Sequence, residues 1–459
     1  MHPRKLWSRA KHVAHRLGWH HAKLWLSGLR PRRLAASWRF VRAKRTELAA
    51  RRQDPRLTVA VDISPFWEPL TGIGWYLYRL LQAMAERDDV HLRLYGPGLL
   101  DKGDVPEPVV PLPEGPALER VQHRIPEDFS LVWYWLTDRL RPHEQRIIAM
   151  DGNRVLFAPN YFLPARFAGC DGALVATIHD LSFMVVPETM RDSTRRDLEQ
   201  ELRRTAERCA LVLTDSEAVK GEIVEAGLAT AGRVRAVHLA PGSTAGLADG
   251  PMPDGLEARL PRRYVLFVGT VEPRKNLETL LSAFEGYRRD RATAGLPDGD
   301  GLHLVLCGGL GWKTERIVER LEAAQEAGWC KRLGYVSEEE LAAVYKRADW
   351  LALPSLYEGF GLPTVEAMAV GVPLLLSDIP VLREVNGDAG LYAPARDVEA
   401  WTELLHRVEG DGGLRSRHAA AAVRRAGELS WQRTADATVA AWQAALGSGT
   451  RTENAEAGS

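Results

Sequence analysis

The stretch Leu351-Ala-Leu-Pro-Ser-Leu-Tyr-Glu-Gly-Phe-Gly-Leu-Pro-Thr-Val-Glu-Ala-Met-Ala369 begins as a short apolar strand that ends at Ser355. A glycine-bearing loop follows, and Pro363 stands where a proline in the first turn favours the start of a helix. Gly359 and Gly361 allow the backbone to approach a ligand, because neither residue places a Cβ in the way. The stretch therefore predicts a strand, a ligand-binding loop and a helix over residues 363–370.

Two carboxylates frame this loop, Glu358 on the loop itself and Glu366 in the first turn of the predicted helix. The N–H groups of the loop and the positive end of the helix dipole suit a diphosphate. Because a phosphate repels a carboxylate, the acids are better explained as acceptors of hydrogen bonds from sugar hydroxyls, Glu366 from a ribose and Glu358 from a transferred sugar. The alternative interpretation is an acidic pair that only stabilises the start of the helix.

A second motif is Val268-Gly-Thr-Val-Glu-Pro-Arg-Lys-Asn-Leu-Glu-Thr-Leu-Leu281, in which a strand leads into a loop and then into a helix that we expect Asn276 to cap. The loop carries the adjacent cations Arg274 and Lys275, which can neutralise the charge that grows on a departing diphosphate. No Asp-x-Asp pair stands in a comparable loop, so we expect the cations, and no divalent metal, to have this role. A solvated surface charge pair is the alternative.

These residues resemble the retaining GT-B glycosyltransferases of family 4, the glycosyl transferases group 1. Glu358 and Glu366 match the family's E-x7-E pattern around G-F-G-L-P, and residues 269–276 match its G-T-x-E-P-R-K-N loop. The likeness continues through Gly371-Val-Pro373, Ser377-Asp-Ile-Pro380, Glu384 and Asp388-Ala-Gly390, and it covers most of residues 57–445. It implies an α/β fold of two Rossmann-like domains that face one another across a cleft, and transfer from a nucleotide sugar with retention of anomeric configuration.

The rest of the chain alternates between apolar strands and helices, which predicts parallel sheets covered on both faces. Strands are expected at 57–63, 91–95, 154–157, 173–178, 211–214, 233–237, 264–269, 302–307, 331–335, 350–353 and 373–376. Helices are expected at 75–85, 277–287, 315–327, 338–347 and 363–370, and residues 239–261 are predicted to be an interdomain linker. The expected domains are a basic helical extension (1–52), an acceptor domain (53–245), a nucleotide-sugar domain (246–430), a helix crossing back to the first domain (431–446) and a disordered tail (447–459).

The first of the two domains carries further motifs of the family. Thr71-Gly-Ile-Gly-Trp-Tyr76 resembles its glycine loop, so Gly72 and Gly74 are expected in a loop that approaches the donor, although a tight turn is the alternative. His179 follows an apolar strand, and the resemblance implies that it contacts the transferred sugar while Asp180 helps to orient its imidazole. Asn160-Tyr161 and Thr214-Asp-Ser216 also end strands at that edge of the sheet.

Motifs and resemblance together give a set of candidate site residues. The catalytic candidates are His179, Arg274, Lys275 and Glu358. The donor-binding candidates are Gly72, Gly74, Gly269, Phe360, Gly361, Leu362 and Glu366, and the acceptor-side candidates are Asp180, Asn160, Tyr161 and Ser216. No metal ligand is expected, and the nucleotide sugar is a co-substrate, so no cofactor is expected either.

The basic residues are concentrated at the N-terminus. The 459-residue chain has 60 Lys and Arg against 60 Asp and Glu, yet residues 1–52 hold fifteen Lys and Arg, five His and one acid, which leaves about −14 for the remainder. Helical spacing of apolar residues with interleaved Trp7, Trp25 and Trp38 suits an anionic membrane surface. A solvated helical extension that packs on the main body or another subunit is the alternative, and nucleic acid is disfavoured because the acidic remainder would repel it.

The cysteines and the hydropathy pattern indicate a cellular location. The four cysteines form no C-x-x-C pair, which disfavours zinc and disulfide frameworks and fits a reducing compartment. No run of about 18 apolar residues is present, and the basic N-terminus lacks the apolar core of a secretory signal. We therefore expect a cytoplasmic protein, and the membrane interpretation of the basic segment would place it peripherally on the inner face of the plasma membrane.

The pairing of D-I-S and G-I-G-x-Y with G-T-x-E-P-R-K-N-L looks most like bacterial mannosyltransferases, so the favoured reaction is transfer of mannose from GDP-mannose to a glycan or lipid-linked glycan in polysaccharide biosynthesis. A UDP-sugar-dependent transferase of the same family is the first alternative. A nucleotide-sugar epimerase of the same fold fits the E-x7-E segment less well. A catalytically silent partner subunit is disfavoured because the candidate catalytic residues are all present.

Deleting residues 1–50 tests the interpretation of the basic segment. We expect the truncated protein to lose binding to anionic liposomes in a cosedimentation assay, because the cations and tryptophans that would meet the headgroups are removed. Unchanged binding of the truncated protein would refute the membrane interpretation.

Overall fold

The computed structural model describes residues 53–97 except 69 and 71, residues 107–121, and residues 151–449 except 168, 190, 191 and 243, together with single positions 35, 39, 42, 43, 46, 49, 145, 148 and 149. The chain folds as two compact units. The first unit comprises residues 1–177, 208–211 and 439–459, and the second comprises residues 178–207 and 212–438. The predicted basic extension therefore lies almost wholly outside the described residues, as does the predicted tail beyond residue 449.

Parallel strands form a seven-stranded sheet with the order β3-β2-β1-β4-β5-β6-β7. Its strands are β1 (Leu57–Asp62), β2 (Val90–Tyr95), β3 (Leu118–Arg120), β4 (Val155–Ala158), β5 (Ala173–Thr177), β6 (Leu211–Thr214) and β7 (Val234–Ala236). Every residue of β1, β4 and β6 is buried. Continuous apolar strands of this kind require cover on both faces, so they belong inside a parallel sheet.

A second sheet of six parallel strands lies within the second unit and has the order β10-β9-β8-β11-β12-β13. Its strands are β8 (Tyr264–Val268), β9 (His303–Cys307), β10 (Cys330–Gly334), β11 (Trp350–Leu353), β12 (Leu374–Ser377) and β13 (Gly390–Ala393). In both sheets the chain winds outward from a central strand in one direction and then returns to wind in the other. This is the doubly wound order of Rossmann-like sheets.

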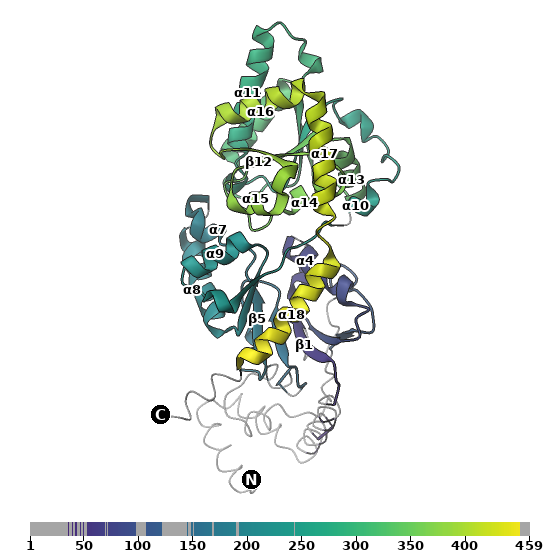
Figure 1. The fold of residues 1–459 in the computed structure, drawn as a ribbon, viewed down its shortest axis with the longest axis vertical. Coiled ribbons are helices and arrows are strands. Elements are labelled where there is room, and N and C mark those ends of the chain that lie inside the picture. The colour runs from purple at the N-terminus through teal and green to yellow at the C-terminus, as the bar shows by residue number, and fades with distance from the viewer. Residues whose placement is uncertain are drawn as a thin grey trace, which may run out of the picture. The chain divides into compact units, whose positions relative to one another are not determined.

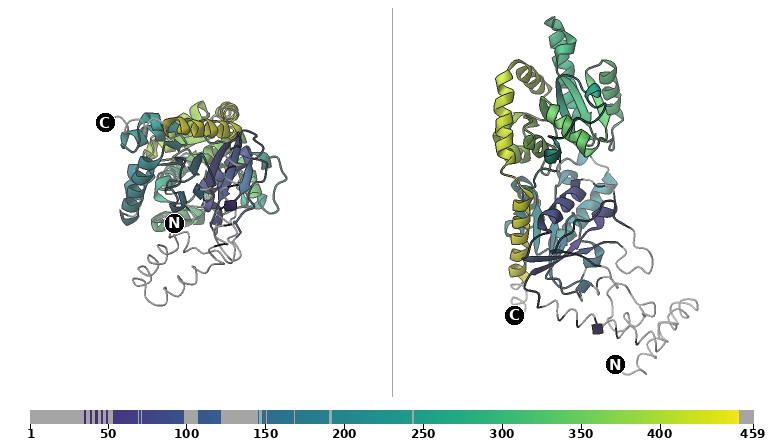
Figure 2. Two further views of the ribbon diagram at one scale, coloured as in Figure 1. Left: turned by 90° about the horizontal axis from the view of Figure 1, so that it is seen from below. Right: turned by 90° about the vertical axis from the view of Figure 1, so that its right-hand side faces the viewer.

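The helices cover these sheets (Figures 1 and 2). The α-helices are α4 (Gly72–Met84), α7 (Ser182–Val185), α8 (Asp192–Arg208), α9 (Glu217–Glu225), α10 (Thr244–Leu247), α11 (Leu277–Thr293), α12 (Glu315–Glu326), α13 (Glu338–Arg347), α14 (Leu362–Ala369), α15 (Pro380–Asn386), α16 (Val398–Gly410), α17 (Gly412–Ala426) and α18 (Trp431–Gly449). Helices α11 and α16 lie side by side in Figure 1 and bury Phe284, Trp401 and Leu405 in the core of the second unit. The short 3-10 helices are η1 (Ser64–Trp67), η2 (Ala165–Phe167), η3 (Pro187–Thr189), η4 (Ala231–Arg233), η5 (Glu257–Arg259), η6 (Pro273–Lys275), η7 (Asp298–Asp300) and η8 (Gly387–Ala389).

The strand orders fix where ligands can bind. In a doubly wound sheet the connections diverge at the point where the order reverses, and the crevice at the carboxyl ends of those two strands is open to a ligand. In the second sheet this point lies between β8 and β11, which pair through Trp350 with Val265 and Leu351 with Leu266. In the first sheet it lies between β1 and β4. The segments that follow these strands are those that the sequence singles out.

Several sequence predictions need correction. The loop predicted at residues 72–74 was wrong, because helix α4 already begins at Gly72. Gly74 lies within this helix, and a Cβ there would stand 2.6 Å from Cδ2 of Leu70, so the end of the leucine side chain would have to move. Strands β3 and β13 were not predicted. The predicted linker at 239–261 contains α10, and Thr244 on this helix is buried within the second unit. The predicted boundary at residue 245 stays a prediction.

The second half of α18 packs on the first unit, beside its sheet (Figures 1 and 2). Trp442 is fully buried there, and its ring meets Phe157 of β4 edge to face at 5.1 Å between centroids. Its indole N–H finds no acceptor among the described residues. The contribution of Trp442 is therefore packing of its ring, without a hydrogen bond.

Replacing this residue tests how α18 is held. We expect Trp442→Ala to lower the free energy of unfolding by about 3–5 kcal/mol, because a large cavity would open beside Phe157. Trp442→Phe should cost less than about 1.5 kcal/mol, because it keeps an aromatic ring and removes an unpaired donor. Urea unfolding followed by far-ultraviolet circular dichroism measures both. Equal losses in the two variants would contradict a role based on ring packing.

Candidate active site

Two loops meet at the reversal point of the second sheet. The segment after β8 contains η6 with Arg274 and Lys275, and the segment after β11 leads to Glu358. The Leu356 amide donates to the carbonyl of Arg274 at 2.9 Å, and the Arg274 guanidinium donates to the carbonyl of Tyr357 at 3.0 Å. The structure therefore brings together the two motifs that the sequence singled out separately.

Asn276 joins the same two loops in an unexpected way. Asn276 stands at the N-cap position of helix α11, as predicted, but its side chain makes no capping hydrogen bond and its backbone is left-handed with φ of 54°. Its side-chain amide donates instead to the carbonyls of Pro354 at 2.9 Å and Ala395 at 2.6 Å. The oxygen of the same amide accepts from the hydroxyl of Thr279 at 2.9 Å. Asn276 thus fixes the loop after β8 against the end of β11.

Glu358 is the centre of a buried charge cluster. Its Oε1 lies 2.6 Å from Nζ of Lys275 and accepts a hydrogen bond from Ser355 at 2.6 Å. Its Oε2 lies 3.3 Å from the Arg274 guanidinium, which also pairs with Glu272 at 2.7 Å. Only 5% of Glu358 and 8% of Lys275 are exposed. Ions this far from water require partners, and each of these has one.

The cluster also determines the charge state of Glu358. Burial alone would raise the pKa of this carboxyl, but Lys275 and Arg274, together with the Ser355 hydroxyl, hold its pKa below the ordinary value. Glu358 is therefore a carboxylate at neutral pH. It can accept hydrogen bonds from a sugar, and it also holds the two cations in place at the end of β8. The predicted contacts of this cluster with diphosphate and sugar remain predictions.

The two glycines of the loop after β11 meet different structural requirements. Gly361 has φ of 90°, in the region that favours glycine, and it precedes helix α14. Gly359 faces another segment of the protein, because a Cβ at this position would stand 2.1 Å from the carbonyl oxygen of His179. Phe360 between them is buried, with its ring 5.8 Å from that of His238. The sequence predicted that a ligand lies against the backbone at Gly359. In the structure the segment of His179 lies there.

Glu366 lies one residue further along α14 than predicted, since the helix begins at Leu362. Its Oε2 accepts a hydrogen bond from the phenol of Tyr345 at 2.9 Å. Burial raises the pKa of Tyr345 well above its ordinary value, so the phenol stays neutral and remains a donor. Gly242 lies next to the other oxygen of the carboxylate, since a Cβ there would stand 2.8 Å from Oε1.

Gly269 ends β8 with φ of 146°, a backbone conformation that favours glycine. It lies back to back with Gly308, because a Cβ on Gly308 would stand 2.1 Å from the carbonyl oxygen of Gly269. The pair lets the segments after β8 and β9 leave the sheet in close contact. The predicted donor-binding role of Gly269, Phe360, Gly361 and Leu362 stays a prediction.

His179 has a different partner from the one predicted. Its Nδ1 lies 2.8 Å from Oδ2 of Asp215, and both side chains are buried. Oδ1 of Asp180 accepts from the amide of Ser182 at 2.9 Å, and the predicted role of Asp180 in orienting the imidazole stays a prediction. Sequence reasoning missed Asp215, although it stands beside Ser216 in the strand-end motif that was noticed. The pairing of residues 36 positions apart left no local signal.

Ser216 was predicted on the acceptor side, and the structure gives its hydroxyl two protein partners. The Oγ atom accepts from the Val219 amide at 3.2 Å, which caps helix α9, and donates to the carbonyl of Gly359 at 3.0 Å. Ser216 is fully buried. The hydroxyl therefore joins α9 to the loop that carries Glu358.

The remaining candidates lie in the first unit. Gly72 and Gly74 are in the first turn of α4, and Asn160 and Tyr161 follow β4. The side chain of Asn160 accepts from the Tyr161 amide at 2.7 Å. Both residues are partly exposed. Their predicted acceptor-side roles stay predictions.

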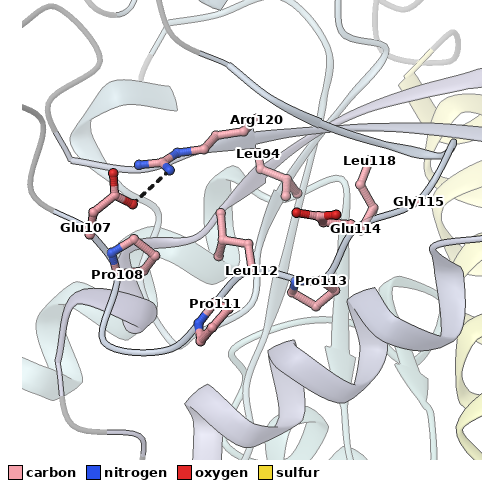
Figure 3. A pocket seen from close by; sticks show the side chains of 10 residues that line it. All are labelled: Leu94, Glu107, Pro108, Pro111, Leu112, Pro113, Glu114, Gly115, Leu118 and Arg120. Carbon is pink, nitrogen blue, oxygen red and sulfur yellow. Dashed lines mark hydrogen bonds and ion pairs between the residues drawn. The ribbon is translucent and has the colours of Figure 1, made fainter.

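The first unit also contains a pocket of about 510 Å³ that the sequence did not suggest (Figure 3). Prolines 108, 111 and 113 line it, together with an ion pair between Arg120 and Glu107 at 3.1 Å. Figure 3 shows Glu114 on the opposite side of the lining. Among the described residues of the lining, Arg120 is the only cation and is already paired with a carboxylate, so this pocket is poorly suited to a diphosphate.

Among the described residues, no group of three or more His, Cys, Asp or Glu side chains is arranged to hold a metal ion. None of the helices in the described part of the chain is long and apolar enough to cross a membrane.

Comparison with known proteins identifies the class. Residues 253–425 match the family described as glycosyl transferases group 1. The chain is 30% identical over 403 residues to O-antigen chain mannosyltransferase B of Escherichia coli, covering 83% of this chain and 97% of that protein. It is 27% identical over 237 residues to O-antigen chain mannosyltransferase RfbU of Salmonella typhimurium, covering 51% of this chain and 60% of that protein. Sucrose-phosphate synthase from Thermosynechococcus elongatus has a similar fold, with a TM-score of 0.56 at 20% identity, over 88% of this chain and 100% of that one.

These matches define a glycosyltransferase with the GT-B fold, so the predicted α/β architecture of two Rossmann-like sheets is confirmed. The chain belongs to the family 4 glycosyltransferases, the glycosyl transferases group 1.

Replacing Lys275 tests the charge cluster. We expect Lys275→Ala to lower kcat by about 100- to 1000-fold, the usual cost of removing one donor that stabilises developing negative charge. Lys346→Ala is the matched control, because Lys346 is 49% exposed and pairs only with exposed Asp249 among the interactions described. Steady-state assays at saturating donor measure both, with melting temperatures as a check on folding. Near-normal turnover of Lys275→Ala would refute the assignment.

Proposed function

We propose that this protein transfers a hexose, with mannose from GDP-mannose favoured, to a glycan or lipid-linked glycan acceptor with retention of anomeric configuration. The observation that carries the proposal is the buried cluster of Lys275, Arg274 and Glu358 at the reversal point of the second sheet. Glu366 stands on the helix that starts from the same loop. Two cations and two carboxylates thus occur where a doubly wound sheet binds its ligand.

The chemistry follows from these groups. The bond between the anomeric carbon and the diphosphate breaks, and a new bond forms from the same carbon to an acceptor hydroxyl, whose proton passes to the leaving phosphate. Arg274 and Lys275 would stabilise the negative charge that develops on the diphosphate. Glu358 would accept hydrogen bonds from the moving sugar, and Glu366 from the ribose. No metal is needed in this scheme, because the cations of the chain supply the positive charge.

The donor and the acceptor are inferred from relatives. Both curated relatives described above are O-antigen chain mannosyltransferases, which supports a mannosyl donor and a polysaccharide product. A membrane-bound, lipid-linked acceptor is consistent with the fifteen Lys and Arg within residues 1–52. We therefore place the reaction on the cytoplasmic face of a membrane, with the basic segment as the attachment.

A panel of donors tests the proposal. We expect GDP release from GDP-mannose to exceed nucleotide release from UDP-glucose and UDP-N-acetylglucosamine by at least about tenfold. GDP-mannose should also raise the melting temperature, since a ligand at 100 times its Kd stabilises by about 2.7 kcal/mol. Preference for a UDP-sugar would overturn the donor but keep the transferase. If no donor gives nucleotide release or thermal protection, the result would favour a catalytically silent partner subunit.

Matched glutamate variants keep the experiment specific. Glu366→Gln should raise KM for the donor about tenfold or more, because it removes a charged acceptor for the ribose hydroxyls. Glu399→Gln, on the exposed side of α16, should leave KM unchanged. An unchanged KM in Glu366→Gln would contradict the ribose assignment.

A further inference from the structure

We propose that Asp215 is a positioning residue for sugar transfer, which fixes the imidazole of His179 beside the loop that carries Glu358. The proposal rests on the proposed function, and it adopts the contact between His179 and the transferred sugar that the family resemblance implies. Asp215 acts through His179 and does not itself touch the substrate. Three features of the second unit carry this proposal.

The first feature is the position of the pair. The Ile178 amide donates to the carbonyl of Leu213 at 2.8 Å, so the segment after β5 continues beside β6 to the end of that strand. His179 and Asp215 are the next residues on the two segments, and their side chains meet at 2.8 Å. Only 8% of His179 and 5% of Asp215 are exposed. The backbone register therefore fixes this pairing.

The second feature is that the same segments hold the loop after β11. The carbonyl of His179 packs against Gly359 so closely that a Cβ there would stand 2.1 Å away. Ser216, the neighbour of Asp215, donates its hydroxyl to the carbonyl of Gly359 at 3.0 Å. The Leu181 amide donates to the phenol of Tyr357 at 2.8 Å. The main chain around His179 therefore contacts both neighbours of Glu358, Tyr357 and Gly359.

The third feature is the chemistry of the pair. The imidazole nitrogen Nδ1 faces a carboxylate, so the hydrogen-bond geometry assigns a proton to Nδ1 and makes Nε2 the nitrogen through which His179 acts. A carboxylate in this position fixes both the tautomer and the rotation of the ring. The charged groups that act on Asp215 besides His179 are Asp180 and His238. Burial raises the pKa of Asp215, and the neighbouring His179 opposes this rise.

A buried ion pair that only stabilises the fold is the competing explanation. It predicts that loss of Asp215 lowers stability and activity whether or not His179 is present. Positioning predicts instead that Asp215 matters for transfer only while His179 is there to be positioned. The two explanations therefore differ in the coupling between the two residues.

A double-mutant cycle in the full chain measures this coupling. We expect Asp215→Asn to lower kcat about 10- to 100-fold with KM for the donor changed less than about threefold. In the background of His179→Ala, the same replacement should change kcat less than about twofold. Asp249→Asn is the control, because Asp249 is 90% exposed. Equal fold-losses in the two backgrounds, or full activity of Asp215→Asn, would overturn the proposal.

Two further measurements keep the proposal testable. If Asp215→Asn does not fold, Asp215→Glu replaces it, and it should retain more kcat than any variant without a carboxylate. Nitrogen NMR of histidine-labelled protein reports the tautomer of His179 without any assay of transfer. We expect a proton on Nδ1 in the parent protein and a changed signal in Asp215→Asn. An unchanged signal overturns the positioning role, whereas absence of sugar transfer by the parent protein overturns only the proposed function.

Discussion

The buried ion pair between Lys275 and Glu358 is the interaction on which the site depends. Each ion is shielded from water, so neither can remain charged at low cost without the other. The pair joins the segment after β8 to the segment after β11, which flank the point where the strand order reverses. Ser355 also donates to Oε1 of Glu358, and Arg274 donates to Oε2. The pair thus holds its cations at the place where the fold exposes strand ends to a ligand.

A second set of contacts fixes this loop from the other side. Ser216 holds the carbonyl of Gly359, and Tyr357 donates its phenol to Glu222 of α9 at 2.6 Å while accepting from the Leu181 amide. The loop with Glu358 is therefore attached by hydrogen bonds to α9 and to the segment of His179, and by ion pairs to the segment after β8. Such preorganisation lets catalytic groups act without rearrangement when charge develops.

Much of this arrangement could be predicted from the sequence, and the remainder could not for a physical reason. Strands such as β6 and β11 were predicted at their observed bounds, because continuous apolar runs between turn residues are a local signal. Arg274, Lys275 and Glu358 were recognised because their motifs are compact. The pairing of His179 with Asp215, and the use of Asn276 as a bridge, depend on residues distant in the chain. Gly74 was misassigned to a loop because a glycine inside a helix looks the same in sequence as one in a turn.

The structure also gives the two acids of the E-x7-E motif different partners. Glu358 is balanced by two cations, so its charge is largely compensated within the protein. Glu366 accepts a hydrogen bond from the phenol of Tyr345. A carboxylate accepts hydrogen bonds from neutral hydroxyls and repels phosphate, which fits the proposed contact of Glu366 with a ribose. Glu358 beside its cations can instead lie close to the diphosphate, because those cations screen it. The different partners of the two glutamates therefore give a physical reason for their different proposed positions along the donor.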